Sequence, residues 1–180
     1  MMFPPVEKLR VLHDADTIRA RVRELAGQID ALYGNEPLVV VCVLKGAFLF
    51  FSDLVRELSI SPELDFVRLA SYGNGTESSC SVAFTKDIEL SIEGKHVLIV
   101  EDIIDSGRSM HFLLRQLEAR GARSLRVAVL IDKRERRKFP VRADFVGFAL
   151  TSGFIVGYGL DYAEHYRALP AIYCIPDGNS

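Results

Sequence analysis

The sequence predicts an α/β fold with a mainly parallel, twisted sheet flanked by helices. Short apolar runs rich in β-branched residues recur along the chain, and segments with helical periodicity separate them. The two clearest runs, residues 37–44 and 95–102, lack the polar alternation of a half-exposed strand. Each is therefore expected to be a strand buried on both faces of the sheet.

The composition indicates one globular domain over residues 1–180. Hydrophobic residues make up 49% of the chain, which excludes a disordered protein, and we find no internal repeat or low-complexity linker. The net charge of -2 gives no global reason to expect nucleic acid as a partner. No apolar run is long enough to cross a membrane, and prolines and charges interrupt the N-terminus MMFPPVEKLR, unlike a signal peptide. Three widely spaced cysteines indicate reduced thiols, so we expect a cytoplasmic protein.

The first half of the chain is predicted to begin with an amphipathic helix over 16–33, with Asp16 as its N-cap and Gly34 at its end. The strand 37–44 and a helix over 47–58 follow. Spacings of three and four residues place on the buried face of the first helix Ile18, Val22, Leu25, Ile29 and Leu32.

The middle of the chain is predicted to form a strand at 65–72, and its small polar residues 73–81 form a surface loop. Residues 82–87 are expected to be one strand of a hairpin arm. After the strand 95–102, a helix is expected over 107–120. Further strands are predicted at 125–132, 143–150, 154–160 and 171–175. In such a sheet, ligands bind beyond the carboxyl ends of the strands.

The most informative segment is VLIVEDIIDSGRSM, residues 97–110, in which a buried strand leads through small residues into a helix. Ser106, Gly107, Arg108 and Ser109 describe a phosphate cradle. Free backbone N–H groups at a helix start favour an anion, Gly107 permits an unusual backbone conformation, and the hydroxyls and the guanidinium add donors. The spacing is not that of a Walker P-loop.

Acidic residues precede this cradle at the end of the strand. Glu101 and Asp102 would repel a phosphate that they faced, so they are expected to face sugar hydroxyls and a hard cation such as Mg²⁺. A sugar phosphate would satisfy both the acids and the cradle. The alternative is structural, because acids can end a strand and Asp105 alone is an equally good helix N-cap.

These residues carry a resemblance. VLIVEDIIDSGRS is similar to the signature with which type I phosphoribosyltransferases bind phosphoribosyl pyrophosphate (PRPP), and more narrowly to the hypoxanthine-guanine phosphoribosyltransferase family. Further matches cover 43–58, 65–78, 144–150 and 154–170 in the family's order, within residues 37 to 176. The resemblance implies a small hood formed by the terminal segments. It also implies Mg²⁺ as the cofactor and assembly into a homodimer or homotetramer.

The resemblance implies a role for each matching residue. Glu101 and Asp102 would hold the ribose hydroxyls, and Asp105 to Ser109 the 5-phosphate. Leu44, Lys45 and Gly46 match a pyrophosphate loop whose peptide before the lysine is typically cis, and Arg167 matches a pyrophosphate-binding arginine. The remaining implied residues are Lys133, Phe154 and Ile155 for the purine, Ser71 and Tyr72 for a loop that closes over the site, and Asp161, with Glu101 and Asp102, for the metal.

The implied reaction is purine salvage, in which a 6-oxopurine and PRPP give a nucleotide and pyrophosphate. Asp105 would act as general acid/base at purine N7. Lys133 suits this choice of base, because an ammonium only donates hydrogen bonds and hypoxanthine and guanine present an acceptor at O6. We expect only small-molecule substrates, with no membrane partner.

Three alternatives remain open from the sequence. The base could be xanthine, the chain could be a PRPP-sensing regulator that binds nucleic acid, or it could be a structural homologue without PRPP binding. The regulator is disfavoured because Lys45, Asp105, Asp161 and Arg167 are all retained. The basic run KRERRK, residues 133–138, is interpreted beyond Lys133 as a solvated turn, with attraction of anionic substrate or a subunit contact as alternatives. Residues 78–87 depart from the family's pattern, which leaves the conformation of the closing loop open.

Overall fold

The main sheet has six strands in the order β4-β3-β2-β5-β6-β7. The structure, a computed structural model, describes residues 4–72 and 81–176. All neighbouring strands are parallel except the pair β3 and β4, which confirms the expected mainly parallel sheet and the hairpin arm. The strands are β2 (Leu38–Leu44), β3 (Glu63–Tyr72), β4 (Ser81–Lys86), β5 (His96–Ile104), β6 (Ser124–Lys133) and β7 (Phe145–Leu150).

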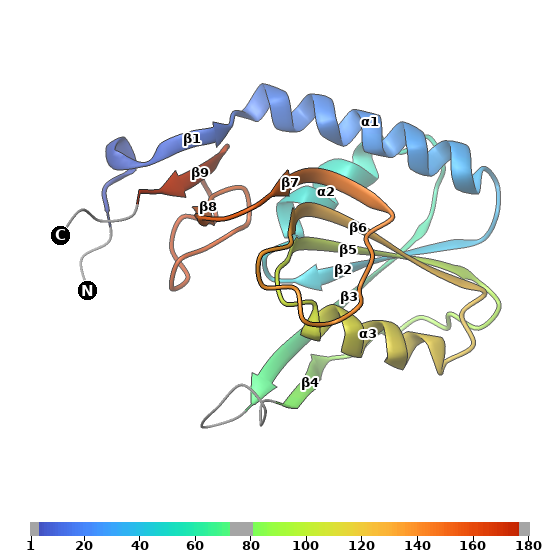
Figure 1. Ribbon diagram of the computed structural model, residues 1–180. Coiled ribbons are helices and arrows are strands. Elements are labelled where there is room, and N and C mark those ends of the chain that lie inside the picture. The colour runs from blue at the N-terminus through green and yellow to red at the C-terminus, as the bar shows by residue number, and fades with distance from the viewer. Residues whose placement is uncertain (1–3, 73–80, 177–180) are drawn as a thin grey trace.

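Helices cover both faces of this sheet. α1 (Ala15–Tyr33) and α2 (Phe48–Glu57) lie on one face and α3 (Arg108–Glu118) on the other (Figure 1). Alternate residues of β5 enter the two resulting cores, because Leu98 packs with the first two helices and Ile99 packs with the third. Both side chains are fully buried, so the central strand is apolar on both faces, as predicted.

A second, three-stranded antiparallel sheet joins the two ends of the described chain. Its order is β1-β9-β8, and a short 3₁₀ turn, η1 (Val6–Lys8), precedes it. It lies on the side toward which the strands of the main sheet point (Figure 1), in the position of the expected hood. Its strands are β1 (Arg10–His13), β8 (Phe154–Val156) and β9 (Ile172–Ile175).

Two details of the first helix differ from the prediction. The N-cap is Asp14 rather than Asp16, because the Asp14 carboxylate accepts a 2.8 Å hydrogen bond from the Thr17 N–H. At the other end, Leu32 is 47% exposed and Tyr33 is 4% exposed. The last step along the buried face is therefore four residues after Ile29, not three.

The strand predicted over 154–160 ends early, at Val156. The next three residues all have positive φ, with values of 95° at Gly157, 50° at Tyr158 and 98° at Gly159. Such a backbone cannot continue a strand, so the chain turns into the loop that carries Asp161 and Arg167. Of the predicted surface loop 73–81, residues 73–80 lie outside the described residues. Among the described helices, none has the length and apolarity to cross a membrane.

Alanine substitutions at Gly147 and Gly27 are expected to change the stability of the protein in opposite directions. A Cβ on Gly147 would lie 2.4 Å from the Leu130 carbonyl oxygen of β6, whereas one on Gly27 of α1 would meet nothing within 4 Å. We expect Gly147→Ala to lower the free energy of unfolding by about 1–3 kcal/mol through overpacking. We expect Gly27→Ala to raise it by about 0.5–1 kcal/mol through helix propensity. Denaturant unfolding measures both, and equal shifts would contradict the packing of β6 against β7.

Candidate active site

The turn between β5 and α3 forms a small hollow. β5 runs to Ile104, two residues beyond the prediction, and Gly107 takes a left-handed conformation (φ 83°) before α3 begins. The hollow has a volume of about 170 Å³. The predicted cradle residues Ser106, Gly107, Arg108 and Ser109 come together around it, and the acids Glu101 and Asp105 also contribute to its lining. This confirms the expected strand–turn–helix context of the cradle.

A larger cavity of about 540 Å³ lies beside the hollow at the carboxyl ends of β5 and β6. Phe154 on its wall is 49% exposed although its ring contacts that of Tyr162, 5.2 Å between centroids, so part of the ring is open to a bound molecule. Lys133 is only 8% exposed, and its ammonium donates to the Gly153 carbonyl oxygen at 3.1 Å. The lining includes, from four separate segments, Asp102, Asp105, Lys133, Phe154, Ile155 and Asp161.

Asp105 lines both the hollow and the cavity. Its carboxyl oxygen Oδ1 is buried and has no hydrogen-bond partner among the residues that the structure describes. A buried acceptor without a donor typically costs about 1–3 kcal/mol, so such atoms are rare unless a ligand pairs with them. A donor on a bound molecule at the junction of the two spaces would remove this cost.

The adjacent acids Glu101 and Asp102 face different spaces, Glu101 the hollow and Asp102 the cavity. Burial, together with the charge of Asp102, raises the pKa of Glu101 well above its ordinary value, and burial also raises the pKa of Asp102. A cation or hydroxyl donors beside the pair would offset this cost. Within residues 4–72 and 81–176, no three His, Cys, Asp or Glu side chains are arranged to hold a metal.

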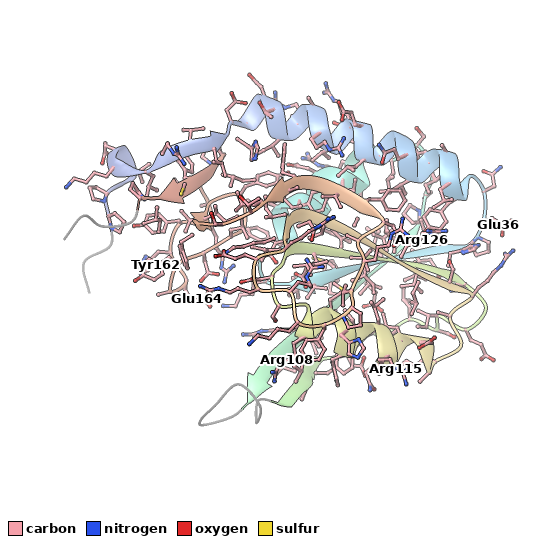
Figure 2. All side chains as sticks on the ribbon, viewed as in Figure 1. Glu36, Arg108, Arg115, Arg126, Tyr162 and Glu164 are labelled. Carbon is pink, nitrogen blue, oxygen red and sulfur yellow. The ribbon has the colours of Figure 1, made fainter. Side chains whose placement is uncertain are left out.

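Lys45 and Arg167, the two predicted pyrophosphate-binding cations, both contact the carboxylate of Glu164. The Leu44–Lys45 peptide is cis, as expected, and the Lys45 ammonium lies 2.8 Å from a carboxylate oxygen of Glu164. Arg167 contacts the same Glu164 oxygen at 3.4 Å and Asp161 at 2.8 Å. Its Nε is buried without a partner in the described part of the chain. Figure 2 shows Glu164 on the loop after β8 and Arg108 at the start of α3.

A close backbone approach between the loop after β2 and the turn after β8 was not predicted. A Cβ on Gly159 would lie 2.0 Å from the Gly46 carbonyl oxygen, and one on Gly46 would lie 1.7 Å from the Asp102 carboxylate. At Gly159 the obstacle is backbone, so only glycine fits there, whereas a side chain at Gly46 would have to displace the Asp102 carboxylate. The Lys45 loop therefore contacts both the turn after β8 and the end of β5. The closely spaced glycines of FIVGYGL were the only sequence signal for it.

The interpretation of residues 134–138 as a solvated turn is wrong for Arg137. Its side chain is only 18% exposed and donates five hydrogen bonds, two of them to the backbone before the cradle. Arg134 is exposed, but it pairs with the buried Asp132 at 2.8 Å. Local charge density cannot reveal which of the four cations in residues 134–138 folds inward, because the partners come from β5, β6 and the loop before β7.

Ser71 and Tyr72 end β3, where they pair with Val82 and Ser81 of β4. The structure therefore puts the base of the predicted closing loop on the β3–β4 arm. The loop itself, residues 73–80, lies outside the described residues, so its closing role stays a prediction.

Comparisons with known proteins agree with this geometry. A family model described as "Phosphoribosyl transferase domain" matches residues 10–163. The hypoxanthine-guanine phosphoribosyltransferase of Aquifex aeolicus (strain VF5) is 44% identical over 172 residues, covering 95% of this chain and 97% of the relative. The hypoxanthine-guanine-xanthine phosphoribosyltransferase of Tritrichomonas foetus is 42% identical over 164 residues, covering 91% and 89%. The crystal structure of a Staphylococcus aureus hypoxanthine phosphoribosyltransferase superposes with a TM-score of 0.90 at 40% identity, covering 93% and 92%.

The raised pKa of Glu101 predicts a pH-dependent cost in stability. The folded state holds this proton more tightly than the unfolded state, so the free energy of unfolding falls as pH rises through the raised pKa. Glu101→Gln removes the titrating group. We expect the variant to be more stable than the unmodified protein at about pH 8, with the difference shrinking toward about pH 5. Denaturant unfolding in EDTA tests this, and a difference that does not change with pH would contradict it.

Proposed function

The chain belongs to the phosphoribosyltransferase family, and on that premise we propose that it transfers the 5-phosphoribosyl group of PRPP to hypoxanthine or guanine. The products would be IMP or GMP and pyrophosphate, which is a purine salvage reaction. The observation that carries the proposal is the unpartnered, buried carboxyl oxygen of Asp105 at the junction of the phosphate-sized hollow and the base-sized cavity. A nucleotide occupying both spaces would meet Asp105 at its glycosidic bond.

PRPP is proposed to bind with its 5-phosphate in the small hollow. The left-handed Gly107 and the first residues of α3 line this hollow, and the backbone N–H groups and dipole at a helix start favour negative charge. Ser106 and Ser109 line the same hollow and add hydroxyl donors. Arg108 contributes less directly than its charge suggests, since its guanidinium lies over the Phe139 ring, 5.5 Å from the centroid.

The purine is proposed to fill the larger cavity, with one face against Phe154. Among the described residues, the buried Lys133 ammonium donates one hydrogen bond, at 3.1 Å to the Gly153 carbonyl, and lies 3.9 Å from Glu135, so it can also donate to the O6 acceptor of a 6-oxopurine. Adenine carries an amino donor at this position and would leave the lysine opposed to another donor. Sites built around a required hydrogen bond can discriminate by roughly 10⁴–10⁵-fold. Backbone groups of Ile155, which lines the cavity, are proposed to read the 2-position.

The proposed reaction breaks the bond from ribose C1 to pyrophosphate and forms the bond from C1 to purine N9. Asp105 accepts the N7 proton of the base as the new bond forms, and returns it in the reverse direction. Lys45 and Arg167 stabilise the negative charge that grows on the leaving pyrophosphate. No covalent intermediate with the protein is needed.

The residues fit Mg²⁺ as the cofactor. Magnesium prefers oxygen ligands and usually takes one or two protein carboxylates together with substrate phosphates and water, which agrees with a site that offers the adjacent pair Glu101 and Asp102. Asp161 is the third proposed ligand, and its carboxylate forms a 2.8 Å ion pair with Arg167 and accepts a hydrogen bond from the Glu164 N–H. When bound, the ion would neutralise charge on the pyrophosphate.

Two further features belong to the proposal. The segment that begins at Ser71 and Tyr72 is proposed to close over the site and exclude water during the reaction. The chain is also proposed to assemble as a homodimer or homotetramer. Xanthine remains the second candidate base, because relatives named for different bases share similar identity with this chain.

The enzyme assay tests the proposed function directly. Purified protein with PRPP and Mg²⁺ is offered hypoxanthine, guanine, xanthine, adenine or uracil, and nucleotide formation is followed by chromatography. We expect turnover of hypoxanthine or guanine that falls by about 10²–10⁴-fold in Asp105→Asn, since the amide keeps the shape but cannot accept the proton. Preference for xanthine would move the base assignment. PRPP binding without turnover of any base would favour a regulator.

The ion pairs of Glu164 predict a change in substrate affinity. Its carboxylate contacts Lys45 and Arg167, and these contacts must loosen if pyrophosphate is to use both cations. Exposed ion pairs are weak, so Glu164→Gln is expected to lower KM for PRPP by only about 1.5- to 5-fold. Initial-rate kinetics at saturating hypoxanthine measure this, with KM for hypoxanthine as the internal control. A higher KM for PRPP would show that Glu164 assists binding instead.

A further inference from the structure

The side chain of Arg137, in the segment after β6, forms hydrogen bonds with the backbone at the end of β5. The Arg137 guanidinium donates through Nε to the Asp105 carbonyl oxygen at 2.9 Å, and through Nη2 to the Ile104 carbonyl oxygen at 3.0 Å. The two residues lie just before Ser106 in the chain, and both line the small hollow. One of the two carbonyls belongs to Asp105 itself, so the guanidinium contacts the backbone of the residue whose carboxylate is proposed to move the proton.

The same guanidinium is anchored on its other side. It donates to the carboxylate of Asp132 at 2.5 Å, to the Val141 carbonyl oxygen at 2.8 Å and to the Lys133 carbonyl oxygen at 3.3 Å. Asp132 is 3% exposed. Burial acts to raise the pKa of Asp132, but hydrogen bonds from Arg134 and Arg137 outweigh it and hold that pKa below its ordinary value. A fixed anion therefore holds the guanidinium in place.

The stem of Arg137 also supports the turn by packing. A Cβ on Gly107 would lie 3.1 Å from Arg137 Cδ and 3.2 Å from the Phe139 carbonyl oxygen, so the turn rests directly on this segment. The Ser106 carbonyl oxygen accepts hydrogen bonds from the N–H groups of Lys138 and Phe139 at 3.0 and 3.1 Å. Residues 137–139 therefore support, from outside the hollow, the turn that lines it.

Only a guanidinium can meet this set of acceptors. Arginine presents five N–H donors in a rigid plane, whereas lysine offers three donors from one point. The acceptors come from β5, from β6 and from the loop before β7, and they surround the group on several sides. Lysine in its place would keep the charge beside Asp132 but would release at least some of the backbone carbonyls.

We propose that Arg137 is a positioning residue for the transfer reaction, which sets the Asp105 carboxylate and the phosphate turn relative to the end of β6. This inference rests on the proposed function. Displacement of a reacting group by about 1 Å can cost about 10²-fold in rate, so loosening this clamp lowers turnover in a chain that remains folded.

The test compares Arg137→Lys and Arg137→Ala with Arg134→Gln. Arg134 is the matched control, because it pairs with the other oxygen of Asp132 but does not contact the phosphate turn. We expect Arg137→Lys to stay folded by thermal unfolding, with kcat about 10–100-fold lower and KM for PRPP raised. KM for hypoxanthine should stay within about twofold, because the contact with the Lys133 carbonyl is the longest of the five. Arg134→Gln should keep near-normal kinetics.

Chemical rescue separates positioning from a general structural role. Millimolar guanidinium or methylguanidinium is expected to restore at least about a tenth of the lost kcat in Arg137→Ala and nothing in Asp105→Asn. If Arg137→Ala does not fold, Arg137→Lys alone decides. A folded Arg137→Lys with unchanged kcat and KM for PRPP would overturn the inference. So would a loss of activity that only follows the unfolded fraction. An unmodified chain that makes no nucleotide would instead overturn the proposed function.

Discussion

The candidate site depends on the position of β5 between two parallel strands, β2 and β6, whose pairing with β5 stops at different residues. β2 pairs with β5 only as far as Val100, whereas β6 continues alongside it to Ile104. The acids that follow Val100 are therefore bounded by β6 on one side and by the Lys45 loop on the other. The stagger opens the space in which the hollow and the cavity lie, and parallel pairing brings every contributing strand to the same edge.

The polar groups at this edge are poorly paired within the described chain. Glu101 is buried beside the partly buried Asp102, while Asp105 and Arg167 each keep a buried polar atom without a partner. Folding alone does not favour such an arrangement, and the two apolar cores on either face of the sheet must compensate for it. Buried polar groups without partners lower stability, and here they lie where the proposed substrates would supply the missing partners.

The sequence was most predictive for elements whose local residue pattern matches their place in the fold. The apolar runs of β2 and β5, the glycine turn before α3 and the family motifs indicated the sheet and most of the charged and aromatic residues that line the two spaces. Arg137 could not be found in this way, because its acceptors come from β5, β6 and the loop before β7, and the neighbouring Arg136 looks the same in sequence. The N-cap was missed because Asp14 and Asp16 both fit the local signal, and only the Thr17 hydrogen bond separates them.

The hood has a consequence for the order in which the protein can form during synthesis. Its middle strand, β9, pairs with β1 from one end of the described chain and with β8 from near the other. A nascent chain could complete the six-stranded sheet and the β5–α3 turn once β7 has left the ribosome. The strand that bears Phe154 gains its partner only after Ile172–Ile175 emerges. The half that carries the β5–α3 turn is thus available early in vectorial folding, and the Phe154 wall of the larger cavity comes last.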